Sequence, residues 1–355
     1  LMNIWALEAA EDKAGALWCG TSPGGLFRSE DRGETWALNE PLWNNETRTR
    51  WNGGGLDQPA IHSICVDPRD PKCVVVAISS GGVWRTCDAG ETWTAHTKGM
   101  VVTHVPPDQA DAPENQDPHC VVQSPSNPEV FWCQHHMGIW WSNDDLATWT
   151  PLQPEAASSF GFPVAVHPTQ PHTAWFVPAH SDQKRAPIDG RVIVSRTRDG
   201  GATFDILTDG LPQTHAYDLV LRHAFDIAAD GDSLAFGSTT GNLWVGNTTT
   251  KTGTLGLGTT ESGAGVLDAI PDFTNSGSFV FASNITFAGD YVGTLLNRVD
   301  YDQPIIVGSN NANGDNTTLS SSTSRDQYIR FMGTADRAAF LTNLNSTTGK
   351  VDFIT

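Results

Sequence analysis

The sequence predicts an all-β protein, and three observations support this. A pattern of Ser or Thr, then Asp, then Thr and a closing aromatic residue occurs four times, with the aromatic residues 57, 56 and 55 positions apart. β-rich runs that contain a Gly turn precede the first three copies. Proline-containing turn sequences, Asp67–Pro71 and Ser124–Pro128, precede two of these runs. Four short antiparallel strands in a repeat of this length indicate a β-propeller blade.

Each unit reads in order as an inner strand, a turn, a second strand, a Gly turn, a third strand, an Asp/Gly turn and a fourth strand. The second and third strands fall in the runs Leu17–Arg28, Val74–Arg85 and Phe131–Trp141. Leu234–Val245 reads as another such pair, although the repeat is lost after it. Five blade-like units are therefore visible over residues 1–246, and six or seven blades are expected if the ring closes.

The repeated turn reads as a structural feature rather than a catalytic one. Its Asp can accept backbone N–H bonds in its own hairpin, its Gly takes a positive φ, and its aromatic residue packs between blades. The third copy has Leu146 where the pattern has Gly. The four aspartates interpreted in this way are Asp31, Asp88, Asp144 and Asp199.

The Ser-x-Asp-x-Gly-x-Thr-Trp pattern resembles the Asp box, or BNR repeat, of sialidase-like β-propellers, and the resemblance covers residues 1–246. It implies a propeller whose repeated turns lie opposite the binding face. It does not imply one function, because such blades also occur in xyloglucan-cleaving enzymes, sorting receptors and photosystem assembly factors. Sialidases hold the substrate carboxylate with three arginines, one in an early Arg-Ile-Pro-type motif. Here Arg185-Ala-Pro187 comes late and lacks the Ile, so we expect no true sialidase.

Composition divides the chain near residue 246. All 13 Trp, 11 His and 6 Cys lie at or before Trp244, whereas residues 247–355 are rich in Thr, Ser, Asn and Gly. The second segment is β-rich in pattern and fits either degenerate closing blades or a separate β-domain.

The charge balance argues against nucleic acid and anionic membranes as partners. The 21 basic and 40 acidic residues give a formal net charge of −19. No apolar run approaches the ~20 residues of a membrane span, and no charged-then-apolar leader opens this chain. An extracellular or cell-surface location is favoured.

The cysteines form no disulfide framework and show no paired metal-ligand spacing. Cys65 and Cys73 flank a tight turn and could face one another, with buried free thiols as the default.

Alignment of the repeats places one ring per blade at the start of the innermost strand. The five rings are those of Trp5, His62, His119, Phe162 and Tyr217. They either fill a narrow axis or form the wall of a ligand site. Loops expected at the same mouth add further polar side chains, namely His135, His136, Lys184, Arg185 and His215. This shared face predicts a substrate-binding site.

Glycoside hydrolysis usually needs two carboxyl groups roughly 5–9.5 Å apart, or a Tyr nucleophile with an acidic partner. Asp57, Asp117 and Asp218 are the candidate catalytic carboxylates, and Tyr217 is the candidate nucleophile. A mixed metal site would combine His62 and His119 with Asp57 or Asp117, but the spacing of these residues does not support it. The adjacent His135 and His136 point to opposite sides of a strand. We therefore expect neither a metal nor a cofactor.

Two functions remain open at this point. The first is a carbohydrate-directed propeller, with glycoside hydrolysis on neutral glycans as its enzymatic form. The second is a non-catalytic binding, assembly or surface protein that docks a glycan or a peptide at the same mouth. Two facing carboxyl groups at the mouth would favour the enzyme, and a ring-lined mouth without such a pair would favour binding.

Overall fold

The computed structural model describes residues 3–53, 58–154, 157–247 and 255–257. Its elements are almost all strands, grouped in five four-stranded sheets. The prediction of an all-β propeller with five visible blades is confirmed. No helix among these residues is long and apolar enough to cross a bilayer.

The strands of each sheet follow one another in chain order from the innermost to the outermost. The first two sheets comprise β1 (Asn3–Ala9), β2 (Leu17–Ser22), β3 (Leu26–Ser29) and β4 (Ala37–Leu38), then β5 (Ile61–Val66), β6 (Val74–Ile78), β7 (Gly82–Thr86) and β8 (Thr94–Ala95). The third and fourth comprise β9 (Pro118–Gln123), β10 (Phe131–His135), β11 (Gly138–Ser142) and β12 (Thr150–Leu152), then β13 (Gly161–Val166), β14 (Ala174–Pro178), β15 (Val194–Thr197) and β16 (Asp205–Leu207). The fifth comprises β17 (Phe225–Ile227), β18 (Ser233–Gly237), β19 (Leu243–Asn247) and β20 (Leu255–Leu257).

The helical elements are short and lie in connections. They are α1 (Glu40–Trp43) and the 3₁₀ turns η1 (Arg48–Arg50), η2 (Pro107–Gln109), η3 (Pro113–Asn115) and η4 (Ile188–Gly190).

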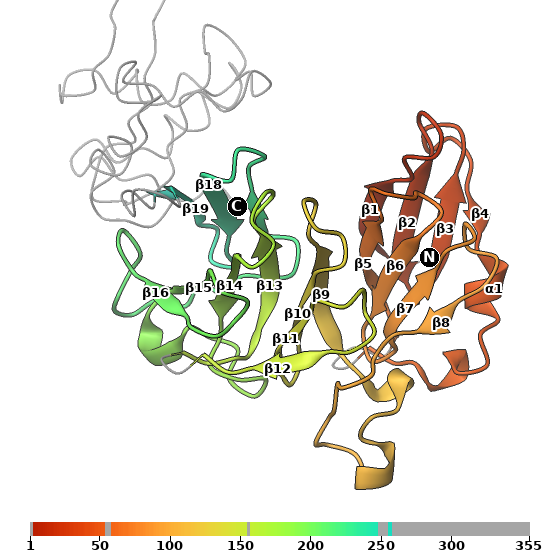
Figure 1. Cartoon of the computed structure of the whole chain (residues 1–355). Helices are drawn as coiled ribbons and strands as arrows, with labels where there is room; N and C mark the ends of the chain where they lie inside the picture. Colours follow the sequence, from red (N-terminus) through yellow and green to blue (C-terminus); the bar gives the residue numbers. More distant parts are fainter. Residues whose placement is uncertain (1–2, 54–57, 155–156, 248–254, 258–355) are drawn as a thin grey trace, which may run out of the picture. The chain divides into compact units, whose positions relative to one another are not determined.

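Innermost strands of successive sheets contact one another, β1 with β5, β5 with β9, β9 with β13 and β13 with β17. Figure 1 shows the first four in this sequence. This is the arrangement of propeller blades around an axis.

The chain divides into two compact units, residues 1–240 with 247–251 and residues 241–246 with 252–355. The site described below lies wholly in the first unit. Apart from Asn247 and β20, the segment predicted over residues 247–355 lies outside the described residues, so its role stays a prediction.

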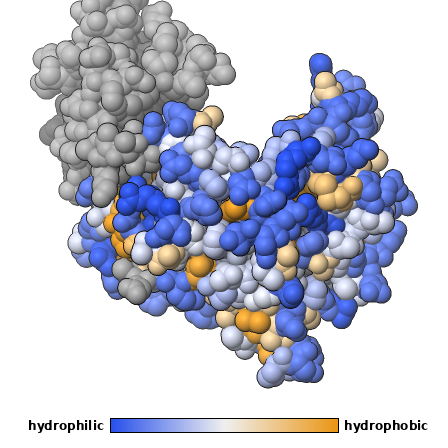
Figure 2. Space-filling model, in the orientation of Figure 1, coloured by the Kyte–Doolittle hydropathy of each residue, from blue (hydrophilic) through white to orange (hydrophobic). Residues whose placement is uncertain are grey.

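The core consists of apolar layers between neighbouring blades, and β6 shows why its sequence is continuously apolar. Val74, Val76 and Ile78 pack toward the first blade with Trp18. Val75 and Ala77 pack on the opposite face, toward the third blade. Because side chains alternate along a strand, a strand between two blades must be apolar on both faces. In contrast, the surface shown in Figure 2 is mainly hydrophilic, with small separate hydrophobic patches.

The four repeated turns are held by their own aspartates. The backbone amides of Thr35, Thr92, Thr148 and Thr203 donate to Asp31, Asp88, Asp144 and Asp199 at 2.9, 2.9, 3.0 and 2.9 Å. Gly33, Gly90 and Gly201 have φ of +87°, +94° and +89°, and Leu146 adopts +66° at the equivalent place. The Leu146 side chain is buried in the layer between the second and third blades. Burial of this side chain offsets the strain of the left-handed conformation.

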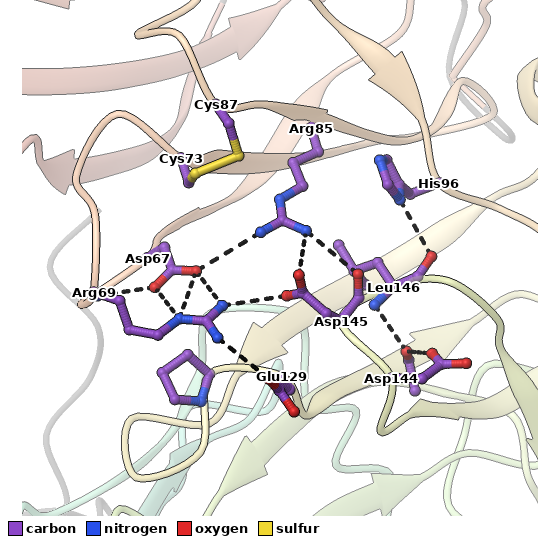
Figure 3. Close-up of polar contacts among 12 residues, drawn as sticks. Asp67, Arg69, Cys73, Arg85, Cys87, His96, Glu129, Asp144, Asp145 and Leu146 are labelled. Carbon is purple, nitrogen blue, oxygen red and sulfur yellow. Dashed lines mark hydrogen bonds and ion pairs between the residues drawn. A yellow bond between two sulfur atoms is a disulfide. The ribbon is translucent and has the colours of Figure 1, made fainter.

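An ionic network joins the second blade to the third on the side of these turns (Figure 3). Arg69 donates to Asp67 at 2.6 Å and contacts Asp145 at 3.2 Å.

Nearby, a disulfide joins Cys73 to Cys87. The expectation of free thiols as the default is therefore wrong for Cys73 and Cys87, and Cys73 pairs with Cys87 rather than with Cys65. β6 and β7 bring Cys73 next to Cys87 through the pairing of Val74 with Thr86, and Cys65 stays a free thiol.

Candidate functional site

Four of the five predicted rings lie at the starts of innermost strands. Trp5 is in β1, and His62, His119 and Phe162 are the second residues of β5, β9 and β13. Tyr217, in contrast, does not lie at the start of an innermost strand. β17 begins only at Phe225, and the Tyr217 side chain is 70% exposed. The shorter fifth repeat made that register ambiguous, because no repeated turn follows to anchor the alignment.

The predicted catalytic carboxylates have different surroundings. Asp57 lies outside the described residues. Asp218 is buried, and its Oδ1 accepts from Ser238 Oγ at 2.6 Å and from Thr240 Oγ1 at 2.5 Å. These bonds tie the segment before β17 to the loop after β18. The neighbouring His215 is exposed with a φ of +54°, and the next amide, that of Ala216, donates to Gly190 O at 2.9 Å.

Asp117 occupies the position immediately before β9 and is 5% exposed. The amide of Ser80 donates to its Oδ1 at 3.3 Å, and its own carbonyl accepts from the amide of His136 at 2.9 Å. Burial raises the pKa of Asp117, while the charges of His136 and Arg222 act in the opposite direction. A carboxyl group in these surroundings is fixed in place by two blades.

His135 and His136 point to opposite sides, as the strand pattern predicts. His135 is fully buried; its ring lies between the amides of Asp117 and Met137, each 3.0 Å from a ring nitrogen. Burial lowers the pKa of His135 to about 3. The His136 ring faces the mouth, with Nδ1 3.6 Å from Asp117 Oδ2 and Nε2 3.5 Å from Asp182 Oδ2.

Cations cover the Phe162 ring. The Phe162 ring also stacks on the His119 ring, with centroids 4.7 Å apart and an angle of 16° between the ring planes. The guanidinium carbons of Arg185 and Arg222 each lie 5.4 Å from its centroid. Arg222 also lies 5.2 Å from the centroid of Trp5, so it links the first blade to the fourth. Lys184, in the same loop as Arg185, is exposed.

Arg222 was missed by sequence reasoning. It stands in an irregular segment with no motif, and only the fold brings it to the axis. The neighbouring His223 donates from Nε2 to the carbonyl of His62, which brings the same segment to the second blade. Burial, with Arg222 next, lowers the pKa of His62 well below its ordinary value.

A cavity of about 630 Å³ runs along β1, β5 and β9. Trp5, His62 and His223 line it together with Glu8 and Glu11. Burial, and secondarily the charge of Glu11, raises the pKa of Glu8. Sequence reasoning missed both glutamates because it looked for binding residues at the start of the inner strand, whereas Glu8 lies near the end of β1 and Glu11 follows it. The signal that could have found them is two carboxylates three residues apart at the end of the strand that carries Trp5.

Comparison with known proteins finds partial sequence similarity to two xyloglucanases. The chain is 25% identical over 153 residues to a xyloglucanase of Paenibacillus sp, which covers 40% of this chain and 14% of that protein. It is 34% identical over 84 residues to an oligoxyloglucan-reducing end-specific xyloglucanase of Emericella nidulans, covering 23% of this chain and 9% of that protein. The chain thus spans a small fraction of the length of these relatives.

A similar fold occurs in the crystal structure of a GH74 enzyme from Niastella koreensis. The match has a TM-score of 0.51 at 18% identity and covers 72% of this chain and 37% of that one. No family model matches the sequence. This likeness shows the propeller fold.

Proposed function

We propose that this chain is a carbohydrate-directed propeller that binds a neutral glycan in the cavity along its inner strands. The cavity is the observation that carries the proposal. Its volume of about 630 Å³ is within the range of small-ligand sites, and its lining combines the Trp5 ring with the polar side chains of Glu8, Glu11 and Gln123. An aromatic face beside hydrogen-bonding groups is suited to a sugar ring. The similarity to xyloglucanases supports the same ligand class.

A neutral glycan is favoured over a sialylated one. Two carboxylates line the cavity, and the chain carries a net charge of −19. An anionic sugar would meet like charge there. The cations near the mouth, Arg185 and Arg222, lie over aromatic rings rather than in an arginine triad.

Binding is tested by calorimetric titration with neutral xyloglucan, glucan and xylan oligosaccharides and with a sialylated oligosaccharide. We expect binding of at least one neutral oligosaccharide and none of the sialylated one. Trp5→Ala should weaken this binding about tenfold or more, equivalent to ~1.4 kcal/mol. Trp36→Ala is the matched control, because Trp36 is a partly exposed tryptophan of a repeated turn. Equal affinity of the parent and Trp5→Ala would contradict the proposal.

Hydrolysis is the second candidate function, and the Glu8–Glu11 pair favours it. A glycosidase uses one carboxylic acid of raised pKa to protonate the leaving group and a second carboxylate as base or nucleophile. Glu8, with its raised pKa, fits the acid, and Glu11 fits the second role. The residues predicted from the sequence form the competing catalytic set, namely Asp57, Asp117, Asp218 and Tyr217.

Reducing-end release from the same oligosaccharides distinguishes the two sets. If Glu8 and Glu11 are catalytic, Glu8→Gln and Glu11→Gln each lower release by 100-fold or more, whereas Asp218→Asn and Tyr217→Phe leave it unchanged. Glu46→Gln, at an exposed position after α1, is the control. Binding without release would leave a non-catalytic glycan-binding propeller. Release that depends on Asp117 or Asp218 would move the catalytic site to the mouth.

A further inference from the structure

Three side chains of the third blade bring one potential metal-ligand atom each to the same point. Asp117 Oδ2 lies 3.9 Å from His119 Nε2 and 3.6 Å from His136 Nδ1. The candidate ligand atoms of this trio all lie within 4.8 Å of one another. Asp117 and His119 are buried, and the His136 side chain is 22% exposed. The group is therefore enclosed on most sides and accessible through His136.

The strand pattern explains this convergence. Asp117 and His119 are two positions apart at the start of β9, so their side chains point to the same face. His135, the last residue of β10, pairs with Pro118 in the antiparallel ladder. His136 therefore follows β10 directly beside Asp117. The three residues belong to one pair of strands, although His136 is 17 residues from His119 and 19 from Asp117 in the sequence.

A hydrogen bond of His119 fixes its tautomer. Nδ1 lies 2.6 Å from the carbonyl oxygen of Gly161 in β13. A carbonyl oxygen only accepts, so Nδ1 carries the proton, and Nε2 of the neutral ring presents a lone pair. That lone pair faces a carboxylate oxygen, which also only accepts. Two acceptors directed at one another need a cation or a proton between them.

His136 has the complementary arrangement. Its Nδ1 faces Asp117, and its Nε2 lies 3.5 Å from the carboxylate of Asp182 in the loop after β14. A carboxylate behind the outer nitrogen of a histidine is the usual second partner of a metal-binding imidazole, because it orients the ring and raises its basicity. Gly161 O has the same role for His119. Both histidines therefore have the outer partners that metal ligands use.

We propose that Asp117, His119 and His136 form a binding site for a divalent transition-metal ion, with Zn²⁺ as the best match to two imidazoles and one carboxylate. Tetrahedral zinc with bonds near 2.0–2.1 Å places its ligand atoms about 3.3 Å apart, so the three side chains, whose candidate atoms lie 3.6 Å, 3.9 Å and at most 4.8 Å apart, must move closer together around the ion. Three protein ligands leave one coordination position open. The site is separate from the glutamates of the cavity and goes beyond the proposed glycan binding.

Arg222 is a competing cation. Burial raises the pKa of Asp117, and the positive charge of Arg222 acts in the opposite direction. Without a metal, the Arg222 guanidinium would balance the charge of Asp117. The two arrangements differ in one measurable property, which is stoichiometric metal binding.

The test uses tag-free full-length chain dialysed against EDTA and then titrated with Zn²⁺ in competition with a chromophoric chelator. We expect one equivalent of zinc per chain. Asp117→Asn and His136→Gln should each weaken the binding by more than 100-fold, and Asp182→Asn by about 10- to 100-fold, as for removal of an outer partner. His172→Gln, an exposed histidine near Trp141, is the control and should bind zinc like the parent.

Folding of each variant is checked by its circular dichroism spectrum. His136→Gln is the decisive variant if Asp117→Asn does not fold, because the His136 side chain is the most accessible of the three. Cobalt(II) provides a second readout, since its visible absorption reports coordination by protein ligands. Failure of the parent to retain zinc at stoichiometric concentration, or equal retention by His136→Gln, would overturn the proposal. The glycan titration with Trp5→Ala is independent of this result.

Discussion

The guanidinium of Arg85 in β7 lies 2.9 Å from the carboxylate of Asp145, which belongs to the repeated turn of the next blade. The same guanidinium donates to the backbone carbonyl of Asp145 at 3.3 Å. The Arg85 side chain is only 13% exposed, whereas Asp145 is 39% exposed. The contact therefore connects two blades through a mostly buried cation (Figure 3).

Loss of this contact should reduce stability. Arg85→Met keeps much of the apolar stem but leaves Asp145 without its buried partner, and we expect a loss of about 1–3 kcal/mol, typical of a hydrogen bond to a charged group. Arg191→Met is the matched control, because the Arg191–Asp189 pair is 3.4 Å long and largely exposed. Such a pair contributes about 0–1 kcal/mol. Urea unfolding followed by circular dichroism measures both, and equal effects would contradict the prediction.

The Cys73–Cys87 disulfide should stabilise the second blade. It closes a loop with a sequence separation of 14, for which chain entropy gives about 3 kcal/mol. The double variant Cys73→Ala/Cys87→Ala should therefore melt below the parent. Reductant should lower the melting temperature of the parent to that of the variant and leave the variant unchanged. A parent that melts like the double variant without reductant would show that the bond contributes nothing.

The fold was largely predictable because the turns that separate its strands are determined by local sequence. Each repeated turn contains its own acceptor, as Asp31 and Thr35 show, so a short sequence window is enough to place a hairpin. The continuous apolar run of β6 follows from burial between two blades. The fifth blade was less certain, since no repeated turn follows Leu243–Asn247.

The candidate site was predictable only in part. The position of Asp117 two residues before His119 already implies a shared face, and the loop that carries Arg185 was expected at the mouth. The tautomer of His119 depends on Gly161 of the next blade, which is 42 residues away and has no polar side chain. Arg222 reaches the axis from an irregular segment. Such contacts depend on how blades are placed against each other, and residue types alone do not encode them.

Acid should weaken the repeated turns. Hydrogen bonds from Thr35 and Ser29 lower the pKa of Asp31 to about 2, and bonds from Thr86 and Thr92 lower that of Asp88 to about 2. An unfolded Asp titrates near 3.9, so the ionised folded form is favoured above about pH 4, and this stabilisation is lost as the pH falls toward about 2.

Asp31→Asn should consequently lower the melting temperature at pH 7 and reduce its further fall between about pH 4 and 2. Glycan binding at pH 7 should not change, because this turn bonds its own hairpin and does not line the cavity. Asp111→Asn, at an exposed loop position, is the control for removal of a negative charge. A variant with the acid sensitivity of the parent would show that the turn does not depend on its carboxylate.

His62 should make the protein sensitive to milder acid. Its side chain is fully buried, and burial, then the charge of Arg222, lowers its pKa well below the ordinary value. Below about pH 6.5 the unfolded chain binds a proton at this residue that the folded chain does not bind. The free energy of unfolding should therefore be constant above that pH and fall below it, with a slope of up to about 1.4 kcal/mol per pH unit for this group. Urea titrations at pH 7.5, 6 and 5 measure the slope.

The variant His62→Gln separates this effect from packing. It should lower stability at pH 7.5, because a packed ring with a 3.0 Å contact to Ser63 Oγ is removed. It should also make the free energy of unfolding fall less steeply from pH 6 to 5, since one proton fewer is taken up on unfolding. His172→Gln removes an exposed histidine and should keep the slope of the parent. If His62→Gln and the parent lose stability in parallel between pH 6 and 5, the neutral buried His62 is not the source of the acid sensitivity.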